Sequence, residues 1–219
     1  MGSSGCRGVV VLGVWLLLAG VAHAQMAPGP APPGPDAAAA PRRSRLYISA
    51  SVGLGGMHDD LEGSFGFVDG KANGASLGSD VVVGALVRPD LVVAGTVSLD
   101  WVQEPEVVIN DRDVSDTVSV GVLFSLGALV DFALQPHGSG FHFRGGLAFS
   151  RLAVEDESGA MSDHTPSGLS ILLGAGYEWR VSPQWGVGAM LRMVSAFIED
   201  QNISHRLLAG SLAFAVSYR

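Results

Sequence analysis

Two alternating runs decide the fold: residues 167–180, SGLSILLGAGYEWR, and residues 185–197, WGVGAMLRMVSAF, separated by Val181-Ser182-Pro183-Gln184. In both runs, apolar side chains occupy most of the alternate positions, and glycine, serine and charged residues are concentrated between them. A period of two in runs that flank a Pro-containing turn is typical of an antiparallel β-hairpin. The sequence therefore predicts one strand on each side of this turn.

The polar face of the hairpin indicates which environment surrounds it. Glu178, Arg180 and Arg192 share their face with glycines, an arrangement that suits a crowded interior. A soluble sandwich would instead place acid- and Lys-rich positions outward over an apolar core, and such positions are missing here. A transmembrane barrel reverses the soluble pattern, with apolar residues toward lipid and polar residues toward the lumen. We therefore favour the membrane barrel over the soluble sandwich.

Six further runs alternate in the same way, at residues 46–55, 77–87, 91–101, 118–132, 141–150 and 208–218. Most of them reach the roughly 9 to 11 residues that a tilted membrane strand needs. An even number of strands also leaves no unpaired edge in lipid. The fold class predicted for residues 45–219 is all-β, an eight-stranded antiparallel up-and-down transmembrane β-barrel.

The connections between the runs alternate between short and long. The short ones each contain proline, at 88–90, 135–140 and 182–184, and the longer ones are 57–75, 103–116, 154–165 and 199–204. Outer-membrane barrels combine short periplasmic turns with longer external loops. The predicted external loops carry fifteen acidic residues against Lys71 and Arg112, a net charge of −13 compared with −8 for the whole chain. This acidity argues against nucleic-acid binding, which needs a basic surface.

The first residues have the features of an export signal. Arg7 precedes an apolar core at 9–22, and Ala22-His23-Ala24 forms a cleavage site, so residues 1–24 are predicted to be a cleaved signal peptide, with an uncleaved anchor as the alternative. Residues 25–44 are Pro/Ala-rich and are expected to be a disordered leader. The only cysteine, Cys6, lies in the signal, so the mature chain is expected to have no disulfide or Cys-ligated metal. We expect no cofactor and no metal.

Charged residues on the predicted inner face are the main candidates for a functional site. The group near the turn ends of neighbouring strands could form a linked ion-pair cluster and comprises Asp131, Arg144, Glu178 and Arg180. Asp80 and Asp100 lie nearer the loop ends, with Arg192 as their expected partner. Buried charges are tolerated only when paired, and side chains about fill an eight-stranded barrel. We therefore predict a plugged lumen, with a gated narrow pore as the alternative. The predicted lumen cluster comprises Asp80, Asp100, Asp131, Arg144, Glu178, Arg180 and Arg192.

Outward aromatic residues near strand ends predict the two membrane interfaces. Arg151 and Arg206 are also outward and lie at loop ends, where arginine can bind lipopolysaccharide phosphates in bidentate fashion or simply extend to water. The predicted interface aromatics are Trp101, Trp179, Trp185, Phe197 and Tyr218.

In its architecture, residues 45–219 resemble the small eight-stranded outer-membrane barrels of Gram-negative bacteria, the OmpA-barrel and OmpX-like group. The resemblance implies insertion by the barrel-assembly machinery, which reads a last strand with a terminal aromatic. Phe214, Val216 and Tyr218 look like that signal, although Arg219 follows it. It also implies localisation in the outer membrane, contact with outer-membrane lipids and with lipopolysaccharide, and a monomeric state.

Three functions remain open at this stage. The first is a structural or surface-interaction role with a plugged lumen. The second is a narrow pore for small solutes or apolar compounds, as in OmpW-like barrels. The third is a lipid A-modifying enzyme, which would need a histidine beside a serine and a carboxylate. The histidines with serine neighbours, at 137, 164 and 205, lie in or beside turns and loops, and none lies on an outward face next to an outward serine. We therefore predict that the chain is not an enzyme.

Overall fold

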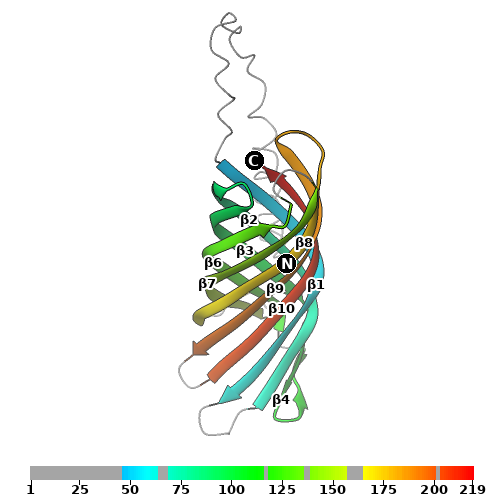
Figure 1. Ribbon diagram of the computed structural model, residues 1–219. Coiled ribbons are helices and arrows are strands. Elements are labelled where there is room, and N and C mark those ends of the chain that lie inside the picture. The colour runs from blue at the N-terminus through cyan, green and yellow to red at the C-terminus, as the bar shows by residue number, and fades with distance from the viewer. Residues whose placement is uncertain (1–45, 64–68, 116–117, 136–138, 157–164, 201–202) are drawn as a thin grey trace, which may run out of the picture. The chain divides into compact units, whose positions relative to one another are not determined.

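The computed structural model describes residues 46–63, 69–115, 118–135, 139–156, 165–200 and 203–219. Within these residues the secondary structure is almost entirely β-strand (Figure 1). The strands are β1 (Leu46–Gly63), β2 (Asp69–Arg88), β3 (Leu91–Gln103), β4 (Glu106–Ile109), β5 (Arg112–Asp113), β6 (Val118–Ala133), β7 (Gly140–Asp156), β8 (Ser167–Arg180), β9 (Trp185–Asp200) and β10 (Ile203–Tyr218). In the described part of the chain, no helix is long and apolar enough to cross a membrane.

Eight of these strands form a closed barrel. Each long strand pairs antiparallel with the next one along the chain. The barrel closes because β1 pairs with both β2 and β10, and the β1–β10 ladder runs from Ile48↔Tyr218 to Gly63↔Ile203. The predicted eight-stranded up-and-down architecture is confirmed. The two remaining strands, β4 and β5, form a small hairpin that pairs with the loop end of β2 through Gly70↔Ile109.

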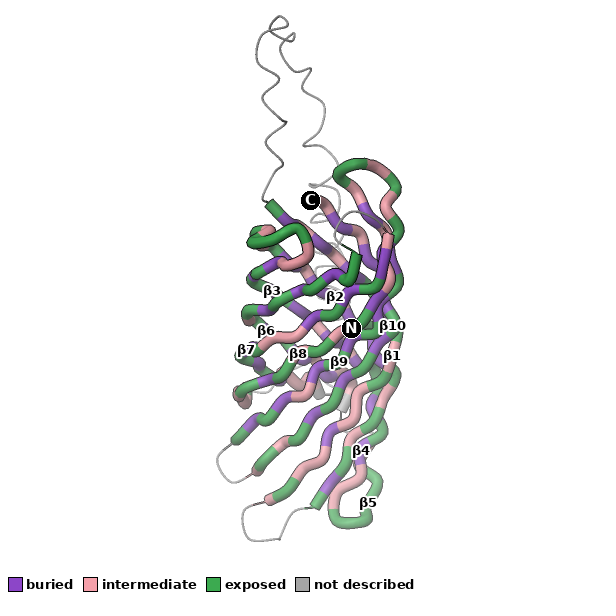
Figure 2. The backbone as a smooth tube through the Cα atoms, viewed as in Figure 1, coloured by how far each residue is buried: buried purple, intermediate pink, exposed green. Residues whose placement is uncertain are grey.

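The barrel wall is apolar on the outside, the reverse of a soluble protein. Exposed and buried positions alternate along the long strands (Figure 2). On β10, Leu212 and Phe214 are 63% and 56% exposed, whereas Ser211 and Ala213 are buried. Soluble monomers rarely expose contiguous apolar patches larger than a few hundred Å². A wall that is apolar all around, over a partly polar interior, is typical of a transmembrane barrel.

The strands extend further at the loop end than the sequence pattern predicts. Most of the predicted loop 57–75 is paired strand, because β1 continues to Gly63 and β2 begins at Asp69. The β4–β5 hairpin in the predicted loop 103–116 was also missed. The apolar alternation marks only the part of a strand that faces lipid, but backbone pairing continues in water with polar and small side chains. The predicted signal peptide and leader lie outside the described residues.

Apolar side chains also fill part of the interior, in two clusters. One lies nearer the loop end and is built around Leu123, Val194, Ile198 and Leu207, all at most 1% exposed. The other lies nearer the turn end and includes Val82, Leu129 and the ring of Tyr47. Inward charges are therefore only one component of the packing inside the barrel.

Because the outer wall is apolar, we expect an outward charged residue to lower the free energy of unfolding by an amount that depends on its depth in the membrane. Leu212→Arg places a guanidinium near the middle of the outer wall and should destabilise the folded protein by about 2–4 kcal/mol in lipid vesicles. Leu134→Arg, at a 55% exposed position just after β6 at the turn end, should cost only about 0–1 kcal/mol. Urea unfolding in vesicles measures both values. Equal, negligible costs at the two positions would contradict a lipid-facing wall.

Candidate functional site

Inside the barrel, two arginines and three aspartates form a continuous series of contacts, which we call the lumen ion-pair chain. Arg144 Nε lies 2.7 Å from Asp131 Oδ2, and Arg144 Nη1 lies 3.5 Å from Asp80 Oδ2. Arg192 holds Asp100 in bidentate fashion, with both N···O distances 2.7 Å. Its Nε atom lies 3.9 Å from Asp80 Oδ1, so Asp80 links the two arginines. All five residues are at most 9% exposed.

Polar side chains from β1 and β7 complete the environment of Arg144. Arg144 Nη2 donates to Tyr47 Oη at 2.8 Å and to Ser49 Oγ at 3.0 Å. Ser51 Oγ donates to Asp80 Oδ1. His142 Nδ1 lies 3.2 Å from Asp131 Oδ1. The Arg144 guanidinium is therefore surrounded by acceptors, as a charge inside a barrel requires.

The alternation of inward and outward positions along the strands, together with a small residue at Gly78, allows Asp100 and Arg192 to meet inside the barrel. Asp100 on β3 and Arg192 on β9 come from strands that are not neighbours, so their pair crosses the lumen. Gly78 lies beside this pair. A Cβ atom there would lie 2.5 Å from Arg192 Nη1 and 2.9 Å from Asp100 Oδ1. Glycine on the inner face thus leaves room for a long charged side chain.

Glu178 lies in a separate group at the turn end. Its Oε2 atom accepts hydrogen bonds from Ser217 Oγ at 2.7 Å and from Arg219 Nη2 at 3.2 Å. The Arg219 guanidinium also lies over the Tyr47 ring, 5.4 Å from its centroid. Arg180 is half-buried and donates to the carbonyl of Pro183 at 3.3 Å. Of the seven predicted lumen residues, five are brought together, Glu178 has a different partner, and Arg180 is not connected to them.

Sequence reasoning missed several partners inside the barrel. It did not assign His142, Tyr47 or Arg219 to the site, although the parity of β1 and β7 places Tyr47 and His142 on the inner face. It also missed a row of buried hydroxyls, in which Ser125, Ser150 and Ser170 are joined by Oγ···Oγ distances of 2.6 and 2.5 Å. A hydroxyl-to-hydroxyl contact between neighbouring strands depends on register, which a single sequence does not reveal.

The interior leaves little free volume beside the lumen ion-pair chain. A cavity of about 30 Å³ is lined by Asp80, Arg144 and Arg192 together with Thr96, Ser98 and apolar side chains. A water molecule needs about 10–15 Å³ measured in this way. The cavity therefore has room for about two waters and not for a solute.

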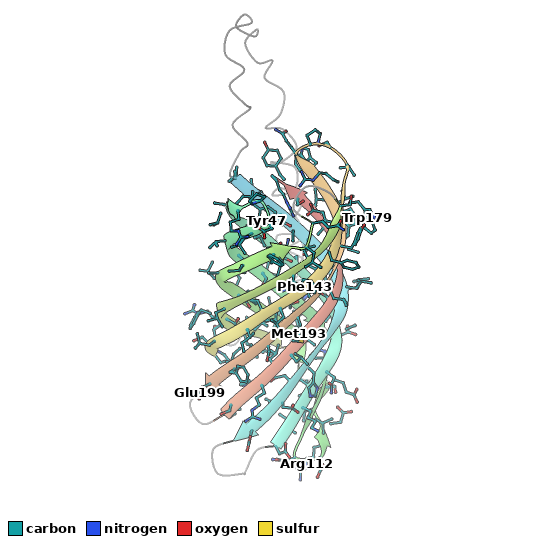
Figure 3. All side chains as sticks on the ribbon, viewed as in Figure 1. Tyr47, Arg112, Phe143, Trp179, Met193 and Glu199 are labelled. Atoms are coloured by element: carbon teal, nitrogen blue, oxygen red, sulfur yellow. The ribbon has the colours of Figure 1, made fainter. Side chains whose placement is uncertain are left out.

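The predicted interface aromatics lie at both ends of the barrel wall. At the turn end the rings of Trp185 and Tyr218 are 5.3 Å apart. Trp179, which is labelled in Figure 3, lies 5.0 Å from the ring of Tyr177. Phe197 is 51% exposed near the loop end of β9 and pairs with Arg206. Trp101 is half-buried near the loop end of β3. The turn end thus carries the denser group of aromatic rings.

The histidines considered for catalysis do not form a catalytic arrangement in the described part of the chain. His205 faces the lumen, and its Nδ1 atom lies 2.8 Å from Asp59 Oδ2. Ser204 lies on the opposite face of β10 and is exposed. The other two candidates, His137 and His164, lie outside the described residues. Ser139 Oγ accepts the backbone N–H of Arg180 at 2.9 Å.

The acidic loop before β6 uses its side chains to close a turn. Asn110 and Asp111 have φ angles of 49° and 61°, and Asn110 Oδ1 accepts the N–H of Asp69 at 3.0 Å. The Asp113 carboxylate accepts from Ser115 Oγ at 2.5 Å and from Ser115 N at 3.0 Å. Among the described residues, no group of three or more His, Cys, Asp or Glu side chains is placed to hold a metal ion.

Comparison with solved structures relates this barrel to known ones. The Neisserial surface protein A (NspA) aligns over 80% of this chain and 97% of its own, with a TM-score of 0.55 and 16% identity. The two chains share a fold. The outer membrane protease OmpT of Escherichia coli (6% identity; 79% and 96% covered; TM-score 0.44) and the N-terminal β-barrel domain of Pseudomonas aeruginosa OprF (16%; 80% and 97%; 0.40) align less well, too weakly to support further conclusions.

No family model matches the chain, and no curated protein matches it in sequence. The alignment with NspA confirms the predicted resemblance to small eight-stranded outer-membrane barrels for the fold. The role of the barrel has to be inferred from the residues of this chain.

The lumen ion-pair chain predicts a large effect of removing one guanidinium. Arg144→Ala leaves Asp131 and Asp80 buried without their shared partner, so unfolding in vesicles should become easier by about 3–5 kcal/mol. Arg180→Ala is the matched control. Among the described residues, the Arg180 side chain donates a hydrogen bond only to the Pro183 carbonyl, and the variant should change stability by less than about 0.5 kcal/mol. Similar values for the two variants would show that the lumen ion-pair chain contributes no more to stability than a single half-exposed arginine does.

The hairpin predicts a local pH effect outside the membrane. The hydrogen bonds from the Ser115 hydroxyl and N–H lower the pKa of Asp113. Because the folded pKa is lowered, this interaction is present above the ordinary aspartate pKa and is lost as the pH falls through the folded value. Ser115→Ala removes the hydroxyl contact and should raise the pKa of Asp113, measured by NMR titration of its carboxyl carbon. An unchanged pKa would contradict this assignment.

Proposed function

We propose that the chain is a monomeric outer-membrane barrel with a closed lumen, and that it has a structural or surface-interaction role without enzymatic activity. Export occurs through the signal peptide at 1–24, and insertion requires the barrel-assembly machinery. The observation that carries the proposal is the combination of an apolar outer wall with an interior that holds paired charges and buried apolar side chains. The partners expected from this placement are outer-membrane lipids and lipopolysaccharide.

The height of the apolar wall supports a membrane location. Along β10, outward positions change from Arg206 to leucine and phenylalanine and end at Tyr218. At about 3.4 Å per residue and a tilt of about 40°, this stretch spans roughly 30 Å along the barrel axis. The lipid-facing band of such barrels is about 25 Å tall and is flanked by aromatic residues. Arg206 and Tyr218 would then lie at the two interfaces.

The packing of side chains inside the barrel supports a plug over a pore. The lumen ion-pair chain crosses the barrel, and the apolar cluster around Leu123, Ile198 and Leu207 fills the interior nearer the loop end. A solute would have to displace both, and an apolar constriction also resists hydration. These two barriers argue against the narrow pore suggested by the OmpW-like alternative.

The loop end offers surface for contact outside the membrane. The β4–β5 hairpin extends the wall beyond β3 and exposes Arg112 and Asp113 (Figure 3). Polar, exposed groups on a paired backbone are suited to interaction with other surface molecules. This part of the protein is where we expect partner-specific contacts.

Planar-bilayer recording tests the closed lumen. The wild-type barrel should give no reproducible conductance. Arg144→Ala should also stay closed, because the apolar cluster remains even when the ion pairs are weakened. Reproducible channels in the wild type, enlarged in Arg144→Ala, would replace the plug with the pore alternative.

Incubation of the folded barrel with radiolabelled lipid A tests the enzyme alternative. We expect unchanged lipid after prolonged incubation, because no described histidine is placed beside a serine and a carboxylate on the outer wall. A protein-dependent loss or gain of acyl chains would show enzymatic activity.

A further inference from the structure

A shallow groove lies on the outer wall over β9, β10, β1 and β2, away from the lumen. Its volume is about 460 Å³, and Gly56, His58, Asn73, Met193, Leu208 and Gly210 are among the residues that line it. Figure 3 shows Met193 partway along the barrel, between Phe143 and the loop end near Glu199. The groove therefore interrupts the wall in its loop-side half.

Strand register explains why the wall is hollow here. Met193, Gly210, Gly56 and Ala75 occupy adjacent outward positions on four successive strands. A Cβ atom at Gly56 or Gly210 would have its nearest neighbour 3.6 or 3.9 Å away, an ordinary van der Waals distance, so both positions have room for a side chain. Packing inside the barrel does not demand glycine at these two positions. The floor of the groove is thus built from small residues that a larger side chain could replace.

A leucine row borders the groove on the side of the membrane centre. It occupies the outward positions two residues further toward the turn end on the same four strands. The row consists of Leu191, Leu212, Leu54 and Leu77, which are 64%, 63%, 73% and 41% exposed. A hydrocarbon chain lying in the groove would contact this row on one side and Met193 on the floor.

Polar residues border the groove on the loop side. The nearest row contains His58 and Asn73, and the next contains Arg206, Asp60 and Lys71 on adjacent strands. His58 Nε2 lies 3.2 Å from Asp60 Oδ2, so the carboxylate has a partner. Among the described residues, neither Arg206 nor Lys71 lies within ion-pair distance of a carboxylate. Both side chains are exposed, and Asp60 lies between them on β1, so this row carries two cations and one carboxylate above the groove.

The position of these cations matches a membrane interface. Arg206 lies at the loop-side end of the apolar stretch of β10, and Lys71 lies two strands away, roughly 10 Å from it at about 4.8 Å per strand. The following outward row is acidic at Glu62 and Asp69. An anionic group would therefore bind at the level of Arg206 and Lys71 and be repelled further out.

We propose that this groove, together with Lys71 and Arg206, binds one phosphorylated lipid of the outer leaflet, namely lipopolysaccharide through its lipid A part. An acyl chain occupies the floor between the leucine row and Leu208. A phosphate is held by the Arg206 guanidinium, which suits bidentate phosphate contacts, and by the Lys71 ammonium. The inference rests on the proposed outer-membrane location, and it specifies where the lipid binds.

Native mass spectrometry of the folded barrel in detergent micelles, titrated with diphosphorylated lipid A, tests the site. The wild type should retain one lipid. Gly56→Leu/Gly210→Leu fills the floor and Lys71→Ala/Arg206→Ala removes the phosphate contacts, and each pair should weaken retention about tenfold, equivalent to about 1.4 kcal/mol. Lipid A without phosphates should bind the wild type as weakly as diphosphorylated lipid A binds the Lys71→Ala/Arg206→Ala variant.

Matched controls separate this site from general effects. Gly145→Leu adds a leucine at another outward glycine, where a Cβ atom would have no neighbour within 4 Å. Arg88→Ala removes an exposed cation at the opposite, turn end of β2. Both should retain lipid as the wild type does. Equal retention by all variants, or by both forms of lipid A, would overturn the groove proposal. A wild type without heat-modifiable gel migration would instead contradict the membrane location itself.

Discussion

The structure depends on one constraint: in hydrocarbon, every backbone N–H and C=O must find its partner within the protein. Pairing β1 with β10 satisfies this constraint, because it converts an open sheet into a barrel without edges in the lipid-facing region. Once the barrel is closed, each side chain on a strand points either outward or into the lumen. The outside must be apolar, and groups that hydrocarbon cannot accommodate must lie inside.

The same constraint explains the composition of the interior. Arg144 and Arg192 cannot remain charged inside without partners, and Asp131, Asp80 and Asp100 supply them from three different strands. The interior is nevertheless not uniformly polar, since one apolar cluster lies nearer the loop end and another, with Tyr47 and Val92, lies alongside Asp131 and Arg144. This mixture of charged and apolar side chains resembles a folded core more than an open channel. The groove over Gly56 and Gly210 shows that the outer wall, too, is not uniform.

The sequence predicted the barrel because its decisive signal is local. Alternation at 167–180 and 185–197 is enough to assign two strands and the face of each residue, and the Pro-containing turns set their order. It could not predict strand ends in water, since pairs such as Glu62↔Asp69 lie beyond the apolar alternation. It did predict Arg192 as the partner of Asp80 and Asp100, and both contacts are present. It could not predict that Glu178 bonds to Ser217 and Arg219, because register and curvature are not encoded by alternation.

The most direct measurement is sedimentation of the purified chain from residue 25 onward, refolded with and without detergent. The inverted wall predicts a folded, monomeric protein only in micelles, and aggregation in plain buffer because the exposed leucines and phenylalanines of eight strands would then face water. A β-rich, monodisperse monomer in plain buffer would contradict the central claim that this wall faces lipid.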